Sequence, residues 1–413
     1  MNEARSIEAE GAAAETKVFR RKVFYIPGYD PFHPRRYREL YRKEGADQAR
    51  ISGYGLTMRP KTTKGPYGWH VSGEIEGGRA ESDVEVLVWS DIVKDSMAQG
   101  IGATYLQLVR TAWAYIGSGA LFRLMRLRKG PVIAALYPIV MLSAQALLAA
   151  MLAGVAAGVG VWLAPWGLWA GLAVGLVAGA VVLRWFRKQD HRFFAYYLMH
   201  DYAYSAQAGG ANPAPLEARM FDFGKSIRAA LESDADEVLV VGHSSGAHLG
   251  VSILADLIRQ GLPEPRPVLS FLSLGHVVPM VSFLPKAQRL RGDLAYLSAR
   301  EELTWVDVTA PGDGCAFALC DPVAVTGVAP DGKRWPLVFS AAFTQTLSPA
   351  RWKELRWRFF RLHFQYLCAF DRPGDYDYFR ITAGPVTLGD RYRHRAPSKT
   401  RIERPVNRYT STA

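Results

Sequence analysis

The stretch from residue 131 to residue 183 constrains this chain more than any other. It holds 53 consecutive residues without Asp, Glu, Lys, Arg or His. A helix crosses a membrane with ~20 apolar residues, so this run is too long for one crossing and suits a hairpin of two. We expect spans near residues 132–156 and 166–183, with Gly and Pro favouring a turn between Gly158 and Gly167. Because helices buried in soluble proteins rarely extend so far without a charge, the run predicts a membrane hairpin.

Basic residues flank the uncharged run on both sides and predict its orientation. They are Arg123, Arg126, Arg128 and Lys129 before it, and Arg184, Arg187 and Lys188 after it. By the positive-inside rule both ends face the cytoplasm. We therefore predict a multi-pass protein of the inner (cytoplasmic) cell membrane, whose remaining chain lies on the cytoplasmic side. Residues 1–17 lack the apolar core of a signal peptide.

Composition narrows the possible partners. Of 413 residues, 49% are hydrophobic and 21% charged, which is enough apolar material for a core and excludes wholesale disorder. Three cysteines, none in a CxxC pair, predict neither a disulfide framework nor a zinc site. About half of the net charge of +12 lies in residues 391–413, which we expect to be a solvated tail that binds no specific nucleic acid.

Outside the hairpin, short apolar strands alternate with amphipathic helices, which predicts a doubly wound α/β sheet. The expected organisation is a disordered start at 1–18 and a first part of the α/β domain at 19–102. A helix at the membrane surface and the hairpin follow at 103–190. The second part of the domain occupies 191–389, and a disordered basic tail follows at 390–413. One long helix is expected over 349–367.

The pattern Gly242-His243-Ser244-Ser245-Gly246 carries the strongest chemical signal. It follows the apolar run 238–241 directly and precedes an apolar-periodic helix over 247–259. A strand-to-helix turn this tight requires small residues two positions on either side of the serine. The turn lifts the hydroxyl above the sheet edge and aims a helix N-terminus at it, where developing negative charge is stabilised. The alternative is a glycine-rich turn in which Ser244 is merely structural.

This placement resembles the nucleophile elbow of the α/β-hydrolase superfamily, particularly its lipase- and esterase-like members. The resemblance covers most of the chain outside the hairpin and the two tails. It implies an α/β-hydrolase-like sheet with an inserted two-helix transmembrane hairpin, and Ser244 as the nucleophile. The implied oxyanion-hole donors are the backbone N–H groups of Ser245 and of Tyr29 or its neighbour, in a loop that breaks at Gly28. As an alternative, that loop is ordinary turn chemistry.

The same resemblance implies the order nucleophile, acid, histidine along the chain. Asp313 follows a predicted strand in a Pro/Gly loop, where the acid belongs, with Asp321 as the alternative acid. His363 is implied as the base, because the only later histidine, His394, lies in the basic tail. The histidines that neighbour the predicted strand ends, His243 and His276, are expected to line the pocket.

The implied reaction is acyl transfer by a serine esterase without metal or organic cofactor. Together with the hairpin, it predicts a membrane-anchored hydrolase of amphiphilic or lipid acyl esters. Two other functions compete: a catalytically silent fold serving as a membrane scaffold or lipid-binding protein, and a channel or transporter component. The uncharged hairpin offers no ionisable pathway residue for the last. The sequence leaves the oligomeric state open.

Overall fold

A mixed sheet forms the centre of the protein in the computed structural model, which describes residues 18–163 and 167–413. The strands in these residues follow the order β2-β3-β4-β1-β5-β6-β7-β8. Strands β4, β1, β5, β6, β7 and β8 are parallel, whereas β2–β3 and β3–β4 pair antiparallel. Their bounds are β1 Arg20–Ile26, β2 Gly55–Pro60, β3 Gly68–Ile75, β4 Gly78–Val86, β5 Glu237–His243, β6 Val268–Leu274, β7 Leu303–Thr309 and β8 Leu337–Ser340. The predicted α/β class is confirmed.

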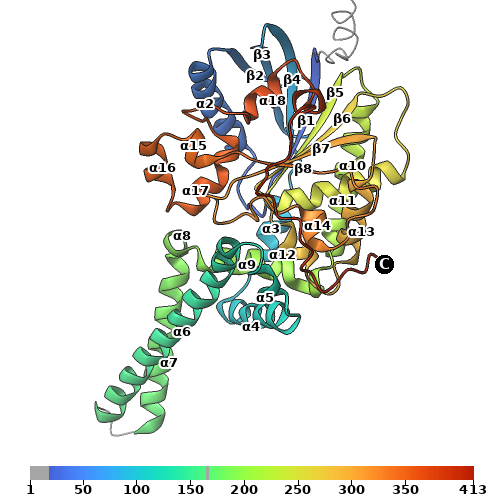
Figure 1. The fold of residues 1–413 in the computed structure, drawn as a ribbon. Helices are drawn as coiled ribbons and strands as arrows, with labels where there is room; N and C mark the ends of the chain where they lie inside the picture. Colours follow the sequence, from blue (N-terminus) through green and yellow to red (C-terminus); the bar gives the residue numbers. More distant parts are fainter. Residues whose placement is uncertain (1–17, 164–166) are drawn as a thin grey trace, which may run out of the picture.

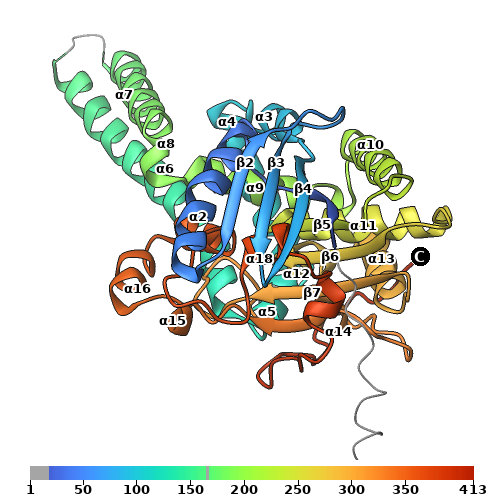
Figure 2. The ribbon, with the colours of Figure 1, turned by 90° about the horizontal axis from the view of Figure 1, so that it is seen from above.

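Helices cover both faces of this sheet (Figures 1 and 2). Alternate residues of the fully buried strand β5 face the two sides: Leu239 and Val241 enter one core, Val238 and Val240 the other. Helices α10 (Ala214–Leu231), α11 (Ser245–Arg259) and α13 (Gln288–Ser298) pack on the second core, and α2 (Arg35–Ser52) and α18 (Tyr378–Ala383) on the first. The remaining helices of the body are α3 Ser90–Met97, α12 Val278–Ser282, α14 Pro322–Thr326, α15 Phe343–Thr346, α16 Pro349–Leu355, α17 Phe359–His363 and α19 Leu388–Arg391, with 3-10 turns η1 Gln207–Gly210 and η2 Phe364–Leu367.

A helical hairpin projects away from the sheet (Figure 1). Its two helices, α6 (Lys129–Leu163) and α7 (Leu168–Lys188), are long and apolar enough to cross a membrane. Their most apolar windows are only 6% and 11% buried, so most of their apolar side chains face outward rather than into a protein core. Helices α4 (Ile101–Gly117), α5 (Ala120–Leu124), α8 (Asp190–Phe193) and α9 (Ala195–Ala206) gather around the hairpin's base.

The first helix of the hairpin is longer than the span that the sequence predicted. Helix α6 continues past Gly158 to Leu163, and α7 begins at Leu168, within the interval expected for the turn; residues 164–166 lie outside the described residues. Gly160, which was expected in the turn, is a helix contact instead. A Cβ on Gly160 would lie 3.0 Å from the Cα of Gly171, so the two helices approach at a distance that only glycine permits.

The base of α6 belongs to the body rather than to the exposed hairpin. Val132 is buried beside Leu124 and Phe317, and Leu142 is buried against Met199 of α9. Helix α6 has 35 residues, or ~50 Å at ~1.5 Å per residue, whereas a hydrocarbon core is ~30 Å thick. Helix α6 is therefore longer than a single crossing would require, and its first part packs against α4, α5 and α9.

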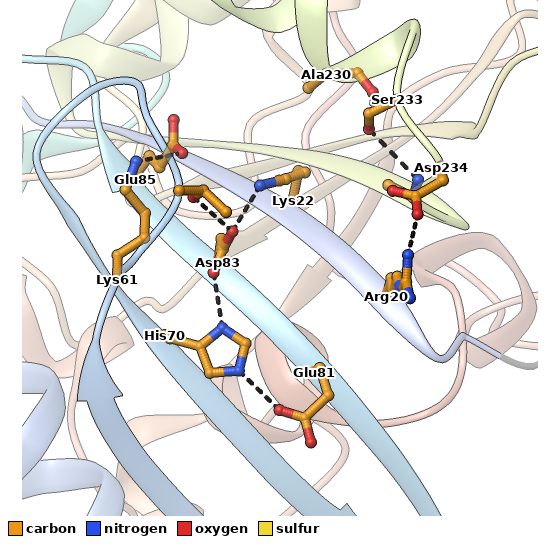
Figure 3. Close-up of polar contacts among 12 residues, drawn as sticks. Arg20, Lys22, Lys61, His70, Glu81, Asp83, Glu85, Ala230, Ser233 and Asp234 are labelled. Atoms are coloured by element: carbon orange, nitrogen blue, oxygen red, sulfur yellow. Dashed lines mark hydrogen bonds and ion pairs between the residues drawn. The ribbon is translucent and has the colours of Figure 1, made fainter.

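Three carboxylates on β4 form a charged ladder along one face of the sheet (Figure 3). Glu81, Asp83 and Glu85 alternate along the strand and so share a face. His70 of β3 lies between two of them, with ring nitrogens 2.7 Å from Asp83 Oδ1 and 2.7 Å from Glu81 Oε2. Lys22 of β1 reaches Asp83 at 2.6 Å. The ladder therefore joins β3, β4 and β1 in one register.

A second polar cluster joins the start of the chain to its end. Arg21 of β1 and Glu237 of β5 form an ion pair of 2.6 Å with both side chains fully buried. Arg21 also donates to the carbonyls of Gly384 and Val386, and Glu237 accepts from the N–H of Leu388. Every charge-bearing atom has a partner, as a buried ion pair requires.

The basic tail differs from its prediction. Arg391 is bound to Glu76 at 2.9 Å, and Ile402 exchanges backbone hydrogen bonds with Leu319 and Asp321. Further along, Asn407 donates to the carbonyl of Ser282. Apolar residues interleaved with the charges, such as Ile402, pack on the body, so the tail is attached rather than solvated. The disordered start expected at 1–18 lies, except for its last residue, outside the described residues.

The long helix expected over 349–367 is broken into α16, α17 and η2. Arg356 and Arg358 interrupt it, and Arg358 has the non-helical angles φ −101° and ψ 68°. The break redirects the chain, and His363 at the end of α17 lies close to Gly275, which follows β6.

Candidate active site

Ser244 occupies a strained turn at the carboxyl end of β5. Its backbone angles, φ 56° and ψ −120°, lie where non-glycine residues are rare. The Ser244 N–H donates to the carbonyl of Leu274 at 2.9 Å, which ties the turn to β6. Helix α11 begins at the next residue, so Ser244 sits at the positive end of a 15-residue helix.

The two glycines of the motif permit this turn because nothing larger fits. A Cβ on Gly246 would lie 2.1 Å from the carbonyl oxygen of Ile26, and one on Gly242 would lie 2.6 Å from that of Gly246. Both distances are far inside van der Waals contact. The spacing of the motif is thus explained by the packing of β1, β5 and α11.

The loop after β1 lies directly against the serine. A Cβ on Gly28 would lie 2.9 Å from Ser244 Cβ and 3.3 Å from Ser244 Oγ. The loop is held on both sides of this contact: Trp89 Nε1 donates to the Pro27 carbonyl at 3.0 Å, and the Tyr197 hydroxyl donates to the Tyr29 carbonyl at 2.6 Å. The expected oxyanion loop and Ser244 are therefore neighbours, and the Ser245 N–H stands free of helical bonding in the first turn of α11.

His363 and Asp313 form a direct pair. His363 Nδ1 lies 2.7 Å from Asp313 Oδ2, and both side chains are buried. A Cβ on Gly275, which has φ 52°, would lie 3.2 Å from His363 Cε1. Gly275 follows Leu274, whose carbonyl binds the Ser244 N–H, so the histidine and the serine flank the same strand end.

The second ring nitrogen of the histidine is available for chemistry. Among the described residues, His363 Nε2 is buried and has no hydrogen-bond partner. With Nδ1 donating to Asp313, Nε2 is the nitrogen that can accept a proton. Base and nucleophile often approach to hydrogen-bond length only when substrate is bound.

Asp313 receives three hydrogen bonds, which keep it ionised. Oδ2 accepts from His363 and, at 3.1 Å, from the Tyr366 hydroxyl, while Oδ1 accepts from the Cys315 N–H at 2.9 Å. Burial raises the pKa of Asp313, but the charge of His363 and these donors outweigh it and hold the pKa below its ordinary value. The carboxylate can therefore fix the imidazole's tautomer and orientation.

The alternative acid, Asp321, faces elsewhere. Its Oδ1 caps α14 by accepting from the N–H groups of Val323 and Ala324, both at 3.0 Å, and its Oδ2 lies 2.7 Å from Lys333 Nζ. These are the contacts of a helix-capping residue. The geometry favours Asp313 as the partner of His363.

The two histidines expected to line the pocket are instead buried supports. His243 Nε2 donates to the backbone carbonyl of His363 at 3.0 Å, and the two rings pack at 4.8 Å. Burial and the charge of His363 lower the pKa of His243 to about 3, so it stays neutral and donates. His276 binds the carbonyl of Cys320 at 2.9 Å and is only 1% exposed.

Three residues of this region were not predicted from the sequence. Tyr366 binds Asp313, Tyr197 holds the Tyr29 carbonyl, and Asp201 lines a small cavity together with Ser245. Burial raises the pKa of Asp201 to about 7. Tyr366 stands three residues after His363, a spacing that places both on one side of a helical turn and could have indicated it.

A metal ion would compete with this arrangement. Asp313, Cys315 and His363 offer ligand atoms within 4.8 Å of one another. However, Asp313 and His363 already bind each other directly, and burial raises the pKa of the Cys315 thiol above its ordinary value, which disfavours the thiolate that metals bind. The donor set suits proton transfer better than metal ligation.

These residues together provide a strained hydroxyl at a helix N-terminus, a backbone loop against it, and an oriented imidazole–carboxylate pair. The arrangement can carry out nucleophilic attack with general-base assistance. Comparison with known proteins adds nothing to this: no protein-family model, curated protein or solved structure matches the chain.

Proposed function

We propose that the protein is a membrane-anchored serine ester hydrolase of amphiphilic or lipid acyl esters. The observation that carries the proposal is the position of Ser244, in its strained turn at the start of α11, beside the same end of β6 as the buried His363–Asp313 pair. A structural serine would not require the unfavourable backbone angles. The strand order and the turn after β5 also support an α/β-hydrolase-like arrangement.

In the proposed reaction Ser244 Oγ attacks the acyl carbonyl while His363 Nε2 takes its proton. The N–H groups of Ser245 and Tyr29 stabilise the oxyanion, each contributing roughly 10²–10³ in rate. His363 then protonates the leaving alcohol, and the acyl group stays on Ser244. A water deprotonated by His363 releases the acid and restores the serine. Asp313 keeps Nδ1 protonated throughout.

The proposed membrane anchor is the hairpin of α6 and α7. Its outward-facing apolar side chains would be costly in water but fit a hydrocarbon core. The flanking cations, including Arg126 and Lys188, lie at the same end of the hairpin and support a cytoplasmic catalytic domain. A periplasm-active reporter fused at Arg126 or Lys188 should therefore give no signal. Reporter activity at either point would reverse the proposed orientation.

Labelling with a fluorophosphonate probe tests the catalytic proposal, since only an activated serine reacts. The wild-type protein should be labelled, and Ser244→Ala should not. Ser226→Ala, which removes an exposed hydroxyl on α10 bound only to the Asp222 carbonyl, is the matched control and should be labelled like the wild type. A folded wild-type protein that resists the probe would favour the catalytically silent scaffold instead.

A further inference from the structure

A polar pocket lies between helices α3, α4 and α9, beside the base of the hairpin (Figure 1). It has a volume of about 230 Å³, many times the ~10–15 Å³ that one water molecule needs, and it opens to the outside. The lining residues that can form hydrogen bonds include Ser96, Gln99, Gln107, Arg110, His200 and Tyr204. None of Ser244, Asp313 and His363 lines it, so the pocket is separate from the candidate active site.

The pocket carries unpaired positive charge. Arg110 of α4 is exposed at its rim, and no residue in the described ranges forms a hydrogen bond or ion pair with the Arg110 guanidinium. No Asp or Glu among the described residues lines the pocket. A second cation, Arg187 in the last turn of α7, donates to the Gln99 carbonyl at 2.6 Å and has no carboxylate partner in the same ranges. An anion that enters the pocket would therefore meet two cations whose charge no carboxylate neutralises.

The buried histidine of the pocket leaves a neighbouring amide free to donate. Burial and the charge of Arg187 lower the pKa of His200 to about 4, so its ring is neutral near pH 7. The neutral ring donates from Nδ1 to Gln107 Oε1 at 2.8 Å. The NH₂ group of Gln107 then has no partner among the described residues, and it can donate to a ligand in the pocket.

Further donors line the pocket. Gln99 and Gln207 each present a side-chain amide that no described residue binds. The Tyr204 hydroxyl is buried and also lacks a hydrogen-bond partner in the described part of the chain. Burial raises the pKa of Tyr204 to about 12, so the hydroxyl keeps its proton and can donate. A phosphate group can accept from more of these donors than a carboxylate can, because it has more oxygens.

The pocket also lies close to the surface that would meet a membrane. Beside Arg110 on α4, Val109 is 62% exposed and Trp113 is 76% exposed. Apolar side chains and a tryptophan next to a cation are typical of a helix at a membrane interface. Arg187 follows the apolar part of α7, and lipid headgroups occupy the layer just outside the hydrocarbon core. In a membrane-inserted chain, the rim of the pocket would therefore face the headgroup layer.

We propose that this pocket, here named the anion pocket, binds the phosphate group of an anionic membrane phospholipid. Arg110 pairs with the phosphate, while the Gln107 amide and the Tyr204 hydroxyl donate to its oxygens. The inference goes beyond the proposed ester hydrolysis, because this binding needs neither Ser244 nor His363. The anion pocket gives the protein a headgroup preference that the apolar hairpin cannot supply. A free phosphate ion offers the same chemistry, so the experiment separates the two sources.

The test measures ligand binding to the detergent-purified, full-length protein. It uses Ser244→Ala protein, so that no ester is cleaved and the result does not depend on the proposed hydrolysis. The melting temperature is followed during titration with dihexanoyl phosphatidic acid, with dihexanoylglycerol, which lacks the phosphate, and with sodium phosphate at equal ionic strength. We expect a saturable rise with phosphatidic acid and no rise with the other two at the same concentrations. An equal rise with dihexanoylglycerol would refute the preference for phosphate, and an equal rise with sodium phosphate would refute the assignment to a lipid.

Three variants test whether this binding occurs in the anion pocket. Arg110→Gln should raise the apparent Kd for phosphatidic acid at least about tenfold, because a charge-assisted hydrogen bond is lost, whereas Arg110→Lys should retain most of the affinity. Arg126→Gln is the matched control: Arg126 is another exposed arginine beside the hairpin, without an ion pair in the described residues, but it lies outside the pocket. Its Kd should equal that of the parent protein. Unchanged affinity in Arg110→Gln, or an equal loss in Arg126→Gln, would overturn the proposal, since the second result indicates general attraction to a basic surface.

Discussion

Replacing Asp313 with asparagine separates the orienting role of this carboxylate from its space-filling role. The side chain keeps its shape, but one acceptor becomes an NH₂ donor. The site presents three donors to two oxygens: His363 and Tyr366 to Oδ2, and the Cys315 N–H to Oδ1. The NH₂ group of an amide must therefore face one of these donors, or force that partner to accept a hydrogen bond instead of donating one.

Two orientations of the amide are possible, and one of them inactivates the histidine. With its oxygen toward His363, the NH₂ faces the Cys315 N–H, which leaves a buried donor unsatisfied at a cost of ~1–3 kcal/mol. With its NH₂ toward His363, the amide satisfies Cys315 but donates to Nδ1. The proton then moves to Nε2, which can no longer accept one from Ser244. The unsatisfied donor favours this second, inactive orientation.

We therefore expect Asp313→Asn to lower kcat on a butyryl ester by roughly 10³–10⁴-fold, or about 4–5 kcal/mol in the activation barrier. The protein should stay folded by circular dichroism. Asp321→Asn is the control: asparagine also caps helices, so α14 keeps its cap while the charge pairing with Lys333 is lost. The kcat of Asp321→Asn should remain within about twofold of the wild-type value, because a helix cap affects the stability of the protein and not the geometry of the active site. A larger loss in Asp321→Asn than in Asp313→Asn would refute the assignment of the acid.

Three further outcomes follow from the structure. Because burial raises the pKa of Asp201 to about 7, its ionisation opposes folding: stability falls as pH rises from about 4 to about 7, and Asp201→Asn should raise the melting temperature at pH ~8 but not at pH ~4. An equal shift at both pH values would contradict this. Gly28→Ala places a methyl group 2.9 Å from Ser244 Cβ and should lower kcat about a hundredfold with little change in melting temperature. An unchanged kcat would count against the proposal that the loop at Gly28 forms the oxyanion hole. Replacing residues 150–178 with a short Gly/Ser linker should preserve butyryl ester hydrolysis, since Ala149 and Gly179 already lie together. Replacing residues 132–183 should instead destabilise the body, because it removes the buried Val132. Equal activity of the two deletion variants would show that the base of α6 is dispensable.

The features that sequence predicted well are those fixed by local physics. The motif around Ser244 is confined to five residues between a strand and a helix, so spacing alone indicated the turn. The alternation of strands and helices followed from hydrophobic periodicity. The uncharged run gave two apolar helices for the same reason, although the first helix continues past Gly158 and Gly160 proved to be a contact with Gly171 of the second.

The features that sequence missed depend on contacts between distant segments. Tyr197 reaches the Tyr29 carbonyl across 168 positions of chain, and no local pattern encodes that bond. The tail was expected to be solvated because its charges dominate its composition, yet Arg391 has a partner in Glu76, which comes from the first hundred residues. The histidines near the strand ends were expected in the pocket, because sequence cannot tell which way a side chain at that position turns.

The buried pair of Arg21 and Glu237 has a consequence for biosynthesis. Strand β1 is made before its neighbour β5, and the carbonyls of Gly384 and Val386 that complete the cluster emerge later still. The apolar hairpin emerges between them, so in a membrane-inserted chain it would enter the bilayer before the central strands can pair. The sheet would then form on a chain already anchored in the bilayer. A chain that stops before residue 384 would keep Glu237 but lack the two carbonyls that complete the hydrogen bonding of the buried Arg21. Truncated products should therefore be recognised as unfolded and degraded, although their membrane segment is complete.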